Sequence, residues 1–427
     1  MPSHPDLPGV PRTRNGLVLA GAAALGAYEV GVVQYLLEDL GRELDRPISL
    51  DVLSGSSAGA INASALAALA DDPIGRSVRL RDAWTQLRLG RILRPSAVQI
   101  LEMLVDLGGG ERWSRLCRRA LVARGGLLDA RPIERLLAAT IPFGQIDNNL
   151  RAGHFAALAV STTHVATGRA VIFFEAAGPV APWGSDPNIV PVSERIGIEH
   201  VMASAAIPLL FPAVPINGDL YVDGGLRQIV PLSPAIHLGA DRLVLVNPLP
   251  SPGPAGAQVE EVRRESLSSP LYLAGKALSA LFTDRMEADL ARVNQLNAVL
   301  TAGRRRFGPR FEAEINAELG AIGARALSRV DAVEIKPTTN LGVIASEVAR
   351  SNELAKRERG PAGRLLRHLA SGDPARSGDL LSYLLFDGAF AARLIEQGRA
   401  DARAKRDELV ALLTRTDMSA PRDAVAR

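Results

Sequence analysis

The chain has 427 residues, 47% of them hydrophobic and 22% charged, and its formal net charge is +3. This composition is typical of a globular protein with one large or two ordinary cores, and the slight charge, with no basic run among aromatic residues, argues against nucleic-acid binding. The single cysteine, Cys117, rules out an intramolecular disulfide, and the six histidines lack metal-ligand spacing, so we expect no metal and no other cofactor.

Residues 1–14 are rich in proline and predict a flexible tail. The apolar stretch Gly16–Leu36 comes next and has two interpretations. It is either a signal peptide or membrane anchor, or it is a buried strand, a turn of small residues and a helix. Glu29 lies inside the stretch, where an acidic group at a bilayer centre costs about 2.5–3.5 kcal/mol on insertion scales.

The second half of this stretch has the periodicity of an amphipathic helix. Polar and apolar residues fall on opposite sides of a 3.6-residue period. The polar side holds Glu29, Gln34 and Glu38, and the apolar side holds Val32, Val33, Leu36 and Leu40. The pattern favours a helix packed on a sheet, so we expect no integral membrane span. We expect a cytoplasmic location, with peripheral membrane contact or export without a classical signal as open alternatives.

Between Leu17 and about Pro250, short β-branched runs alternate with helical patterns. The runs predict buried strands at 17–20, 49–54, 156–163, 170–174 and 242–247. The patterns between them predict helices at 27–42, 58–70, 76–88 and 131–139. Strands that alternate with helices form a mostly parallel sheet covered on both faces. We therefore predict an α/β fold with three layers, α/β/α.

Beyond about residue 251 the pattern becomes helical. Long Ala/Leu/Arg/Glu segments predict helices at 266–302, 311–328, 343–370 and 379–414. One strand interrupts them at 332–337, where Pro337 stops it, and a strand this late is expected to join the first sheet. We expect 15–250 to form the catalytic core, 251–415 to be a helical elaboration of the same fold, and 416–427 to be a flexible tail.

The strongest local motif is Gly55-Ser56-Ser57-Ala58-Gly59, which is the one G-x-S-x-G match in the chain. A serine on a sharp turn from strand to helix has a strained backbone, and glycines two residues before and after it remove side-chain clashes. Here an apolar strand precedes the motif and an Ala-rich helix follows it. Ser57 would lie at a helix N-terminus, where free N–H groups favour developing negative charge. The alternative is a Ser/Gly-rich turn whose serine only caps the helix.

A nucleophilic serine needs a base, and the candidate in this chain is an aspartate. Asp223 follows a short apolar run and precedes Gly224 and Gly225. The two glycines let another part of the backbone approach, so that the carboxylate can project from the end of the strand. Asp-Gly between alternating apolar residues is also a hairpin signal, and the motif alone leaves this alternative open.

Together these segments resemble the patatin-like phospholipase family. The segments "MASAAIPLLFPAV" (202–214) and "VSTTHVATGRAVIF" (160–173) are also similar to it, and 385–404 resembles the helix that closes many bacterial members. The resemblance implies a Ser–Asp dyad without a catalytic histidine, with Ser57 as nucleophile and Asp223 as base. It also implies a lipid substrate, a phospholipid or related fatty-acyl ester, cleaved through an acyl-enzyme with transient contact at a membrane surface.

The family's third element is a glycine-rich oxyanion loop of the form G-G-G-x-[RK]-G. The matching segment, Gly21-Ala22-Ala23-Ala24-Leu25-Gly26, keeps the first and last glycines and lacks the basic residue. An oxyanion hole needs backbone N–H groups, so Gly21, Ala22 and Ala23 remain the candidates. Because a left-handed conformation costs alanine about 1–2 kcal/mol, we expect either an ordinary backbone here or a weakened enzyme.

Two apolar segments with flanking cations, 88–110 and 269–282, are candidates for contact with a membrane surface. We favour the alternative that they pack into the core or cover the site.

Two rival functions stay open. An ordinary α/β-hydrolase needs a histidine after the acid, and His237 and His368 qualify by position. We expect His237 instead to cap a helix before a strand, and His368 to be a surface or packing residue. The altered glycine loop supports the second rival, a catalytically weak or inactive lipid-binding or scaffold protein.

Overall fold

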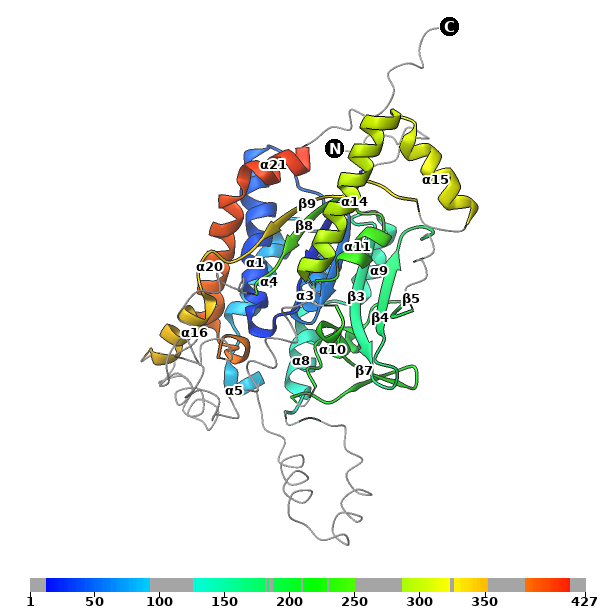
Figure 1. Cartoon of the computed structure of the whole chain (residues 1–427). Helices are drawn as coiled ribbons and strands as arrows, with labels where there is room; N and C mark the ends of the chain where they lie inside the picture. The colour runs from blue at the N-terminus through cyan, green and yellow to red at the C-terminus, as the bar shows by residue number, and fades with distance from the viewer. Residues whose placement is uncertain are drawn as a thin grey trace, which may run out of the picture.

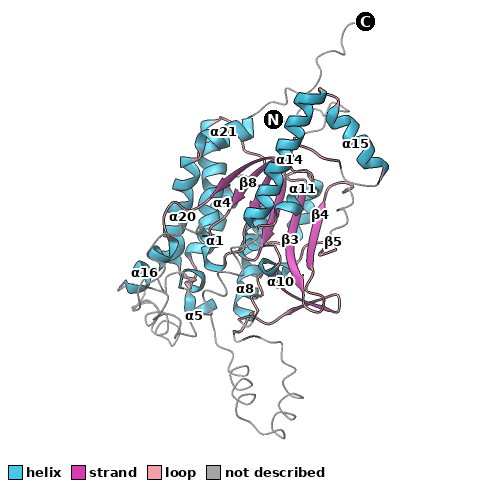
Figure 2. Cartoon of the chain, viewed as in Figure 1, coloured by secondary structure: helices cyan, strands magenta, loops and turns pink. Residues whose placement is uncertain are grey.

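The structure is a computed structural model that describes residues 13–92, 126, 128–180, 183, 187–208, 210–228, 230–249, 286–322, 326–351 and 381–414. Within these residues the strands form one nine-stranded sheet (Figure 2). Its strands are β1 (Asn15–Leu19), β2 (Val52–Ser56), β3 (Ala157–His164), β4 (Ala170–Ala176), β5 (Ile189–Ser193), β6 (Val214–Ile216), β7 (Asp219–Asp223), β8 (Arg242–Val246) and β9 (Asp331–Ile335).

The main path of the sheet runs β5-β4-β3-β2-β1-β8-β9. Strands β3, β2, β1, β8 and β9 run parallel to one another, whereas β4 pairs with β3 in the antiparallel sense. The apolar run Leu17–Leu19 is fully buried, as expected for a central parallel strand covered on both faces. The predicted class, a mostly parallel sheet with helices on both faces, is confirmed.

The second strand begins three residues later than predicted. Residues 49–51 precede the hydrogen-bonded part of the strand. Asp51 and Ser49 instead accept hydrogen bonds from Asn15. The strand then continues to Ser56 because its last residues pair with β3. The serine motif therefore follows directly on a paired strand.

The first helical segment runs from α1 (Gly26–Gln34) through a π-helical turn (Tyr35–Leu40) to α2 (Gly41–Glu43). Its predicted polar side does not face solvent: Glu29 and Gln34 are buried. The reason is that α4 (Gly75–Thr85) and α20 (Gly388–Ala404) pack against this segment, and the three helices gather beside β8 and β9 (Figure 1).

Helices α1 and α20 approach closely at two glycines. A Cβ on Gly31 would lie 2.0 Å from the carbonyl oxygen of Ile395, and a Cβ on Gly398 would lie 2.1 Å from that of Tyr28. The hydroxyl of Tyr28 also donates a 2.9 Å hydrogen bond to Asp401. Helix α20 therefore packs against α1 so closely that their backbones are in contact at these glycines.

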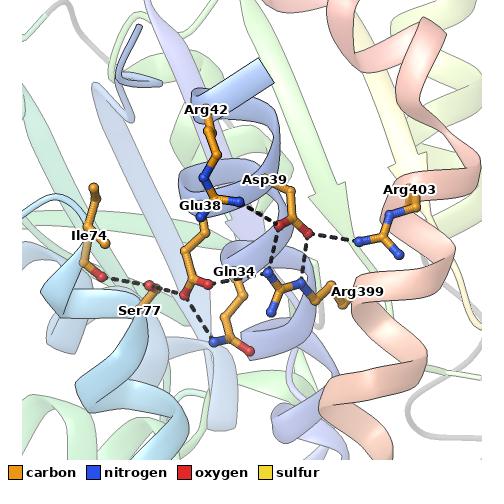
Figure 3. Close-up of polar contacts among 8 residues, drawn as sticks. All are labelled: Gln34, Glu38, Asp39, Arg42, Ile74, Ser77, Arg399 and Arg403. Atoms are coloured by element: carbon orange, nitrogen blue, oxygen red, sulfur yellow. Dashed lines mark hydrogen bonds and ion pairs between the residues drawn. The ribbon is translucent and has the colours of Figure 1, made fainter. Parts of the chain in front are cut away.

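Charged side chains add a second link between these helices (Figure 3). Arg399 on α20 donates to both carboxylate oxygens of Asp39, at 2.6 and 2.7 Å, and also pairs with Glu38. The hydrogen bond from Arg399 lowers the pKa of Asp39. Glu38 in turn accepts a 2.7 Å bond from Ser77 on α4. The network ties together α4, α20 and the end of the first helical segment.

The later part of the chain contributes β9, which pairs with β8, and several helices. These are α14 (Met286–Phe307), α15 (Phe311–Ala321), α16 (Leu341–Arg350) and α21 (Arg406–Thr414). The helix predicted at 379–414 is broken: α20 begins after Asp387, whose carboxylate caps it by accepting a bond from the Ala389 N–H. None of the helices in the described part of the chain has the length and apolar character that a bilayer span requires.

Candidate active site

Ser57 lies on the sharp turn between β2 and α3 (Ala58–Ala68). Its backbone is strained, with φ +51° and ψ −122°. The flanking glycines are sterically required: a Cβ on Gly55 would lie 2.3 Å from the carbonyl oxygen of Gly59, and a Cβ on Gly59 would lie 2.2 Å from that of Leu19. The motif glycines therefore let the turn pack against itself and against the end of β1.

The side chain of Ser57 does not cap α3, although the residue occupies the capping position. Its hydroxyl instead donates a 2.7 Å hydrogen bond to Oδ2 of Asp223. The backbone N–H of Ser57 donates a 2.9 Å bond to Oγ of Ser204 on α10 (Ile198–Ser204), and that hydroxyl donates a 2.6 Å bond to the carbonyl of Ser161. Both the backbone and the side chain of the strained serine are thus held by buried partners.

Asp223 ends β7 and is followed by a 3₁₀ turn, Gly224–Leu226. Its Oδ1 accepts a 2.7 Å bond from the N–H of Gly225, and its carbonyl accepts a bond from Thr163. A Cβ on Gly224 would lie 2.1 Å from the Ser161 carbonyl oxygen, so the aspartate approaches β3 only because glycine follows it.

The hairpin alternative for Asp223-Gly224 is wrong. The tight turn lies six residues earlier, between β6 and β7, where Asn217 and Gly218 both have positive φ, +51° and +91°. Asn-Gly is the stronger signal for such a turn, because both central residues must adopt left-handed conformations. Asp223 is therefore at the far end of the strand from its hairpin.

Burial raises the pKa of Asp223 to about 7, although the hydrogen bonds from Ser57 and Gly225 lower it. The carboxyl is 1% exposed, so its ionised form is desolvated. A base whose pKa lies close to neutral pH is both available and strong enough to take a proton. A carboxyl with a perturbed pKa that contacts a serine on a strained turn is a candidate for a catalytic site.

The Gly21–Gly26 loop lies against the serine. A Cβ on Gly21 would lie 2.8 Å from the Cβ of Ser57, and one on Gly26 would lie 2.7 Å from that of Ala58. Ala22 has an ordinary φ of −152°, whereas Ala23 has a left-handed φ of +48°. The first N–H groups of the 3₁₀ turn Ala23–Leu25 have no intrahelical acceptor. One alanine of the loop therefore bears the strain that glycine would avoid.

An apolar cavity opens beside Ser57 and holds about 790 Å³ of space, part of it open to solvent. Ser57 and Ala23 lie in its wall together with side chains from α3 and α4, among them Ile61, Ala65 and Trp84. Helix α8 (Arg131–Thr140) adds Leu137. The apolar lining suits the hydrocarbon portion of a ligand.

His237, one of the two histidines considered for a triad, has contacts with residues other than Ser57. The ring of His237, at the end of α11 (Leu232–His237), contacts the carbonyl of Ser233 and stacks on Trp183. His368 lies outside the described residues. In the described ranges no group of three or more His, Cys, Asp or Glu side chains is placed to hold a metal ion.

The proposed surface segments are only partly visible. The segment 269–282 lies outside the described residues, as does 88–110 beyond Ile92. Its described start contains the short helix α5 (Leu89–Ile92), and Ile92 lines the cavity. This part of the segment therefore covers the site.

The sequence does not predict the role of Ser204 in holding the serine turn, although the residue lies in the segment 202–214 that resembles the family. Its partners, Ser57 and Ser161, are 147 and 43 residues away, so no local pattern reveals the bond. A serine among alanines just before "IPLLFP" was the available signal.

Two comparisons with known proteins place these observations in context. The family model described as patatin-like phospholipase matches residues 17–236, more than half of the chain. The crystal structure of VipD from Legionella pneumophila is similar over 93% of this chain and 67% of that chain, with 14% identity and a TM-score of 0.33. That structural likeness is too weak to carry an argument about the site.

Proposed function

Because the chain belongs to the patatin-like phospholipase family, which consists of lipid acyl hydrolases, we propose that it cleaves fatty-acyl esters with Ser57 as nucleophile and Asp223 as base. The observation that carries the proposal is the 2.7 Å hydrogen bond from the Ser57 hydroxyl to a buried carboxylate whose pKa is raised to about 7. The hydroxyl is already aimed at its proton acceptor, and the acceptor titrates near neutral pH.

In the first half-reaction, Oγ of Ser57 forms a bond to the ester carbonyl carbon while its proton passes to Oδ2 of Asp223. The carbonyl oxygen takes up the negative charge beside the N–H groups of Gly21, Ala22 and Ala23. The tetrahedral intermediate then collapses, the ester C–O bond breaks, and the leaving alcohol takes the proton from Asp223. The products are the alcohol and an acyl-enzyme on Ser57.

In the second half-reaction, water gives a proton to Asp223 and attacks the acyl carbon. Oγ of Ser57 leaves and recovers the proton, and the fatty acid departs. The apolar cavity is the proposed site of the acyl chain, because Ser57 lies in its wall and the other lining groups are mostly hydrocarbon. The substrate class is therefore a phospholipid or a related fatty-acyl ester.

The test is hydrolysis of nitrophenyl fatty-acyl esters and of phospholipid vesicles by the full chain and three variants. Ser57→Ala and Asp223→Asn are expected to lose at least about 1,000-fold in rate, because removal of an acting nucleophile or base leaves little beyond binding. Ser56→Ala is the matched control, because the hydroxyl of the neighbouring Ser56 is buried and has no hydrogen-bond partner among the described residues. Unchanged turnover in Ser57→Ala or Asp223→Asn would refute the dyad.

A catalytically weak scaffold remains the second candidate, and one observation favours it: Ala23 bears a left-handed φ where the resembled loop carries glycine. If the chain is such a scaffold, the wild-type chain binds the vesicles but releases fatty acid no faster than the Ser57→Ala variant does.

A further inference from the structure

Three buried side chains form a hydrogen-bonded chain behind the Ala20–Gly26 loop. Nδ2 of Asn62 donates a 2.8 Å bond to Oε2 of Glu29, and Nε1 of Trp84 donates a 2.8 Å bond to Oδ1 of Asn62. Glu29 and Asn62 are wholly buried, and Trp84 is 6% exposed. The proposed mechanism uses none of them. Buried polar groups are costly unless they are paired, so their presence here needs a reason.

This set of contacts reaches the end of the loop. Nδ2 of Asn62 also donates a 3.0 Å bond to the carbonyl of Gly26, where the loop ends. Burial raises the pKa of Glu29 well above its ordinary value, while the hydrogen bond from Asn62 lowers it. The carboxyl is thus buried three residues after the end of the loop, with Asn62 as its hydrogen-bond donor.

The other end of the chain of contacts reaches the cavity. The ring of Trp84 lines the cavity wall, and Asn62 lies on α3, five residues after Ser57. The loop also contains Ala23 at φ +48°, and a strained residue keeps its conformation only where its surroundings determine it. Because an alanine in this loop adopts a conformation that glycine would adopt without strain, contacts from outside the loop are needed to hold its backbone.

We propose that Glu29, Asn62 and Trp84 are positioning residues that hold the oxyanion loop against Ser57 and connect it to the wall of the acyl cavity. The proposal rests on the proposed function, since the loop matters to catalysis only if an oxyanion forms there. It assigns to their hydrogen bonds a role in the rate of the chemical step.

The first experiment compares Asn62→Leu with Asn149→Leu. Asn149 is a matched control, because it is also a buried asparagine whose Nδ2 bonds α3, but at the far end, at the carbonyls of Ala67 and Ala68. Asn62→Leu is expected to lower kcat roughly 10- to 100-fold with little change in KM, as a misplaced oxyanion donor would. Asn149→Leu is expected to lower Tm by a similar amount without this loss of kcat.

The second measurement is amide hydrogen exchange of the peptide that contains residues 20–26, which needs no activity. Exchange is expected to become faster in Asn62→Leu and to stay unchanged in Asn149→Leu. This readout separates the two proposals: if the wild-type chain hydrolyses no ester, the proposed function fails, while faster exchange in Asn62→Leu alone still supports the role of Asn62 in holding the loop. Equal exchange in the two variants overturns the positioning role.

Two further variants test the ends of the chain of contacts. Glu29→Gln keeps an oxygen acceptor for Asn62 and is expected to retain more kcat than Glu29→Leu. Trp84→Phe keeps an aromatic wall but removes the N–H group, so we expect kcat to fall by the same factor for short- and long-chain esters. A loss that grows with acyl length, or no advantage of Gln over Leu at position 29, contradicts the proposal.

Discussion

The hydroxyl of Ser57 and the carboxylate of Asp223 meet because one strand, β3, aligns both. On one edge of β3, Ser161 pairs with Ser56 at the end of parallel strand β2. The next residue, Thr162, pairs with Asp223 at the end of antiparallel strand β7. The two strands therefore end head to head along the same edge, and the 2.7 Å hydrogen bond spans the junction.

The first prediction concerns the pH dependence of the rate. Only the ionised form of Asp223 can accept the proton of Ser57, and its pKa is raised to about 7. We expect kcat/KM for a nitrophenyl ester to rise with pH through about 7 and then to level off. The measurement is a pH–rate profile between pH 5 and 9, corrected for spontaneous hydrolysis. A profile that is flat across this range would show that Asp223 is not the titrating base.

The second prediction concerns stability. The folded protein holds the Asp223 proton more tightly than the unfolded chain does, because burial raises the pKa from 3.8 to about 7. This proton stabilises the fold fully below the unfolded pKa of 3.8, and the contribution is lost as pH rises through about 7. The loss is at most about 4 kcal/mol.

Asp223→Asn has no proton to lose, so its stability relative to wild type is expected to be greater at pH 8 than at pH 5. Denaturant unfolding at the two pH values measures this difference. Asp71→Asn, at an exposed position, serves as the control and should show no such change. If the difference in unfolding free energy between Asp223→Asn and wild type is the same at both pH values, burial does not raise the pKa of Asp223.

The third prediction concerns Ala23. At φ +48° an alanine costs about 1–2 kcal/mol that a glycine avoids, while glycine gives back part of this in unfolded-chain entropy. Ala23→Gly is expected to stabilise the fold by up to about 1 kcal/mol and to preserve the rate. Ala22→Gly, at φ −152°, should bring no such gain. If both substitutions destabilise the protein equally, the loop is not strained at Ala23.

The fourth prediction concerns Ser204. Ser204→Ala leaves the buried N–H of Ser57 without its acceptor, which costs about 1–3 kcal/mol. Because the acceptor holds the nucleophile's own backbone, we expect kcat to fall as well as Tm. The control is Ser64→Ala, which removes a buried hydroxyl with no partner among the described residues and should change neither quantity much.

The fifth prediction concerns the cavity. Ala65 lines it and lies eight residues after Ser57, about 12 Å along α3. Ala65→Phe is expected to lower kcat/KM for long-chain esters at least about tenfold, which is what loss of a few buried methylenes would cause, and to spare butyrate esters. The short ester is the internal control for folding. An equal effect at all chain lengths would place the acyl group elsewhere.

The sequence predicts the fold class and Ser57 from local features, whereas the choice of Asp223 as the proposed base over a hairpin turn depended on the family resemblance. A strand, a G-x-S-x-G turn and an Ala-rich helix adjoin at Ser57, and the Asp-Gly-Gly motif requires no distant information. The strand register that brings Ser57 and Asp223 together does require distant information, because Thr162 pairs with Asp223, 61 residues later in the sequence.

Other features could not be predicted because they depend on distant partners. Glu29 is buried and bonds Asn62 on α3, 33 residues later, whereas its polar neighbours suggested a solvent-facing side. The hairpin turn is at Asn217–Gly218 and not at Asp223-Gly224, and Asn-Gly is the stronger turn signal. Backbone strain at Ala23 depends on how the loop packs against Ser57.

The most direct test of the central claim is labelling of the full chain with a fluorophosphonate, followed by mass mapping of the modified residue. This reagent reacts with a serine whose hydroxyl is activated, and covalent modification reports the nucleophile itself. We expect a single adduct on Ser57 that is lost in Ser57→Ala, forms much more slowly in Asp223→Asn, and is retained in Ser56→Ala. An adduct on another serine, or none on the wild-type chain under conditions that label a known serine esterase, would contradict the assignment of Ser57 and Asp223 as a catalytic dyad.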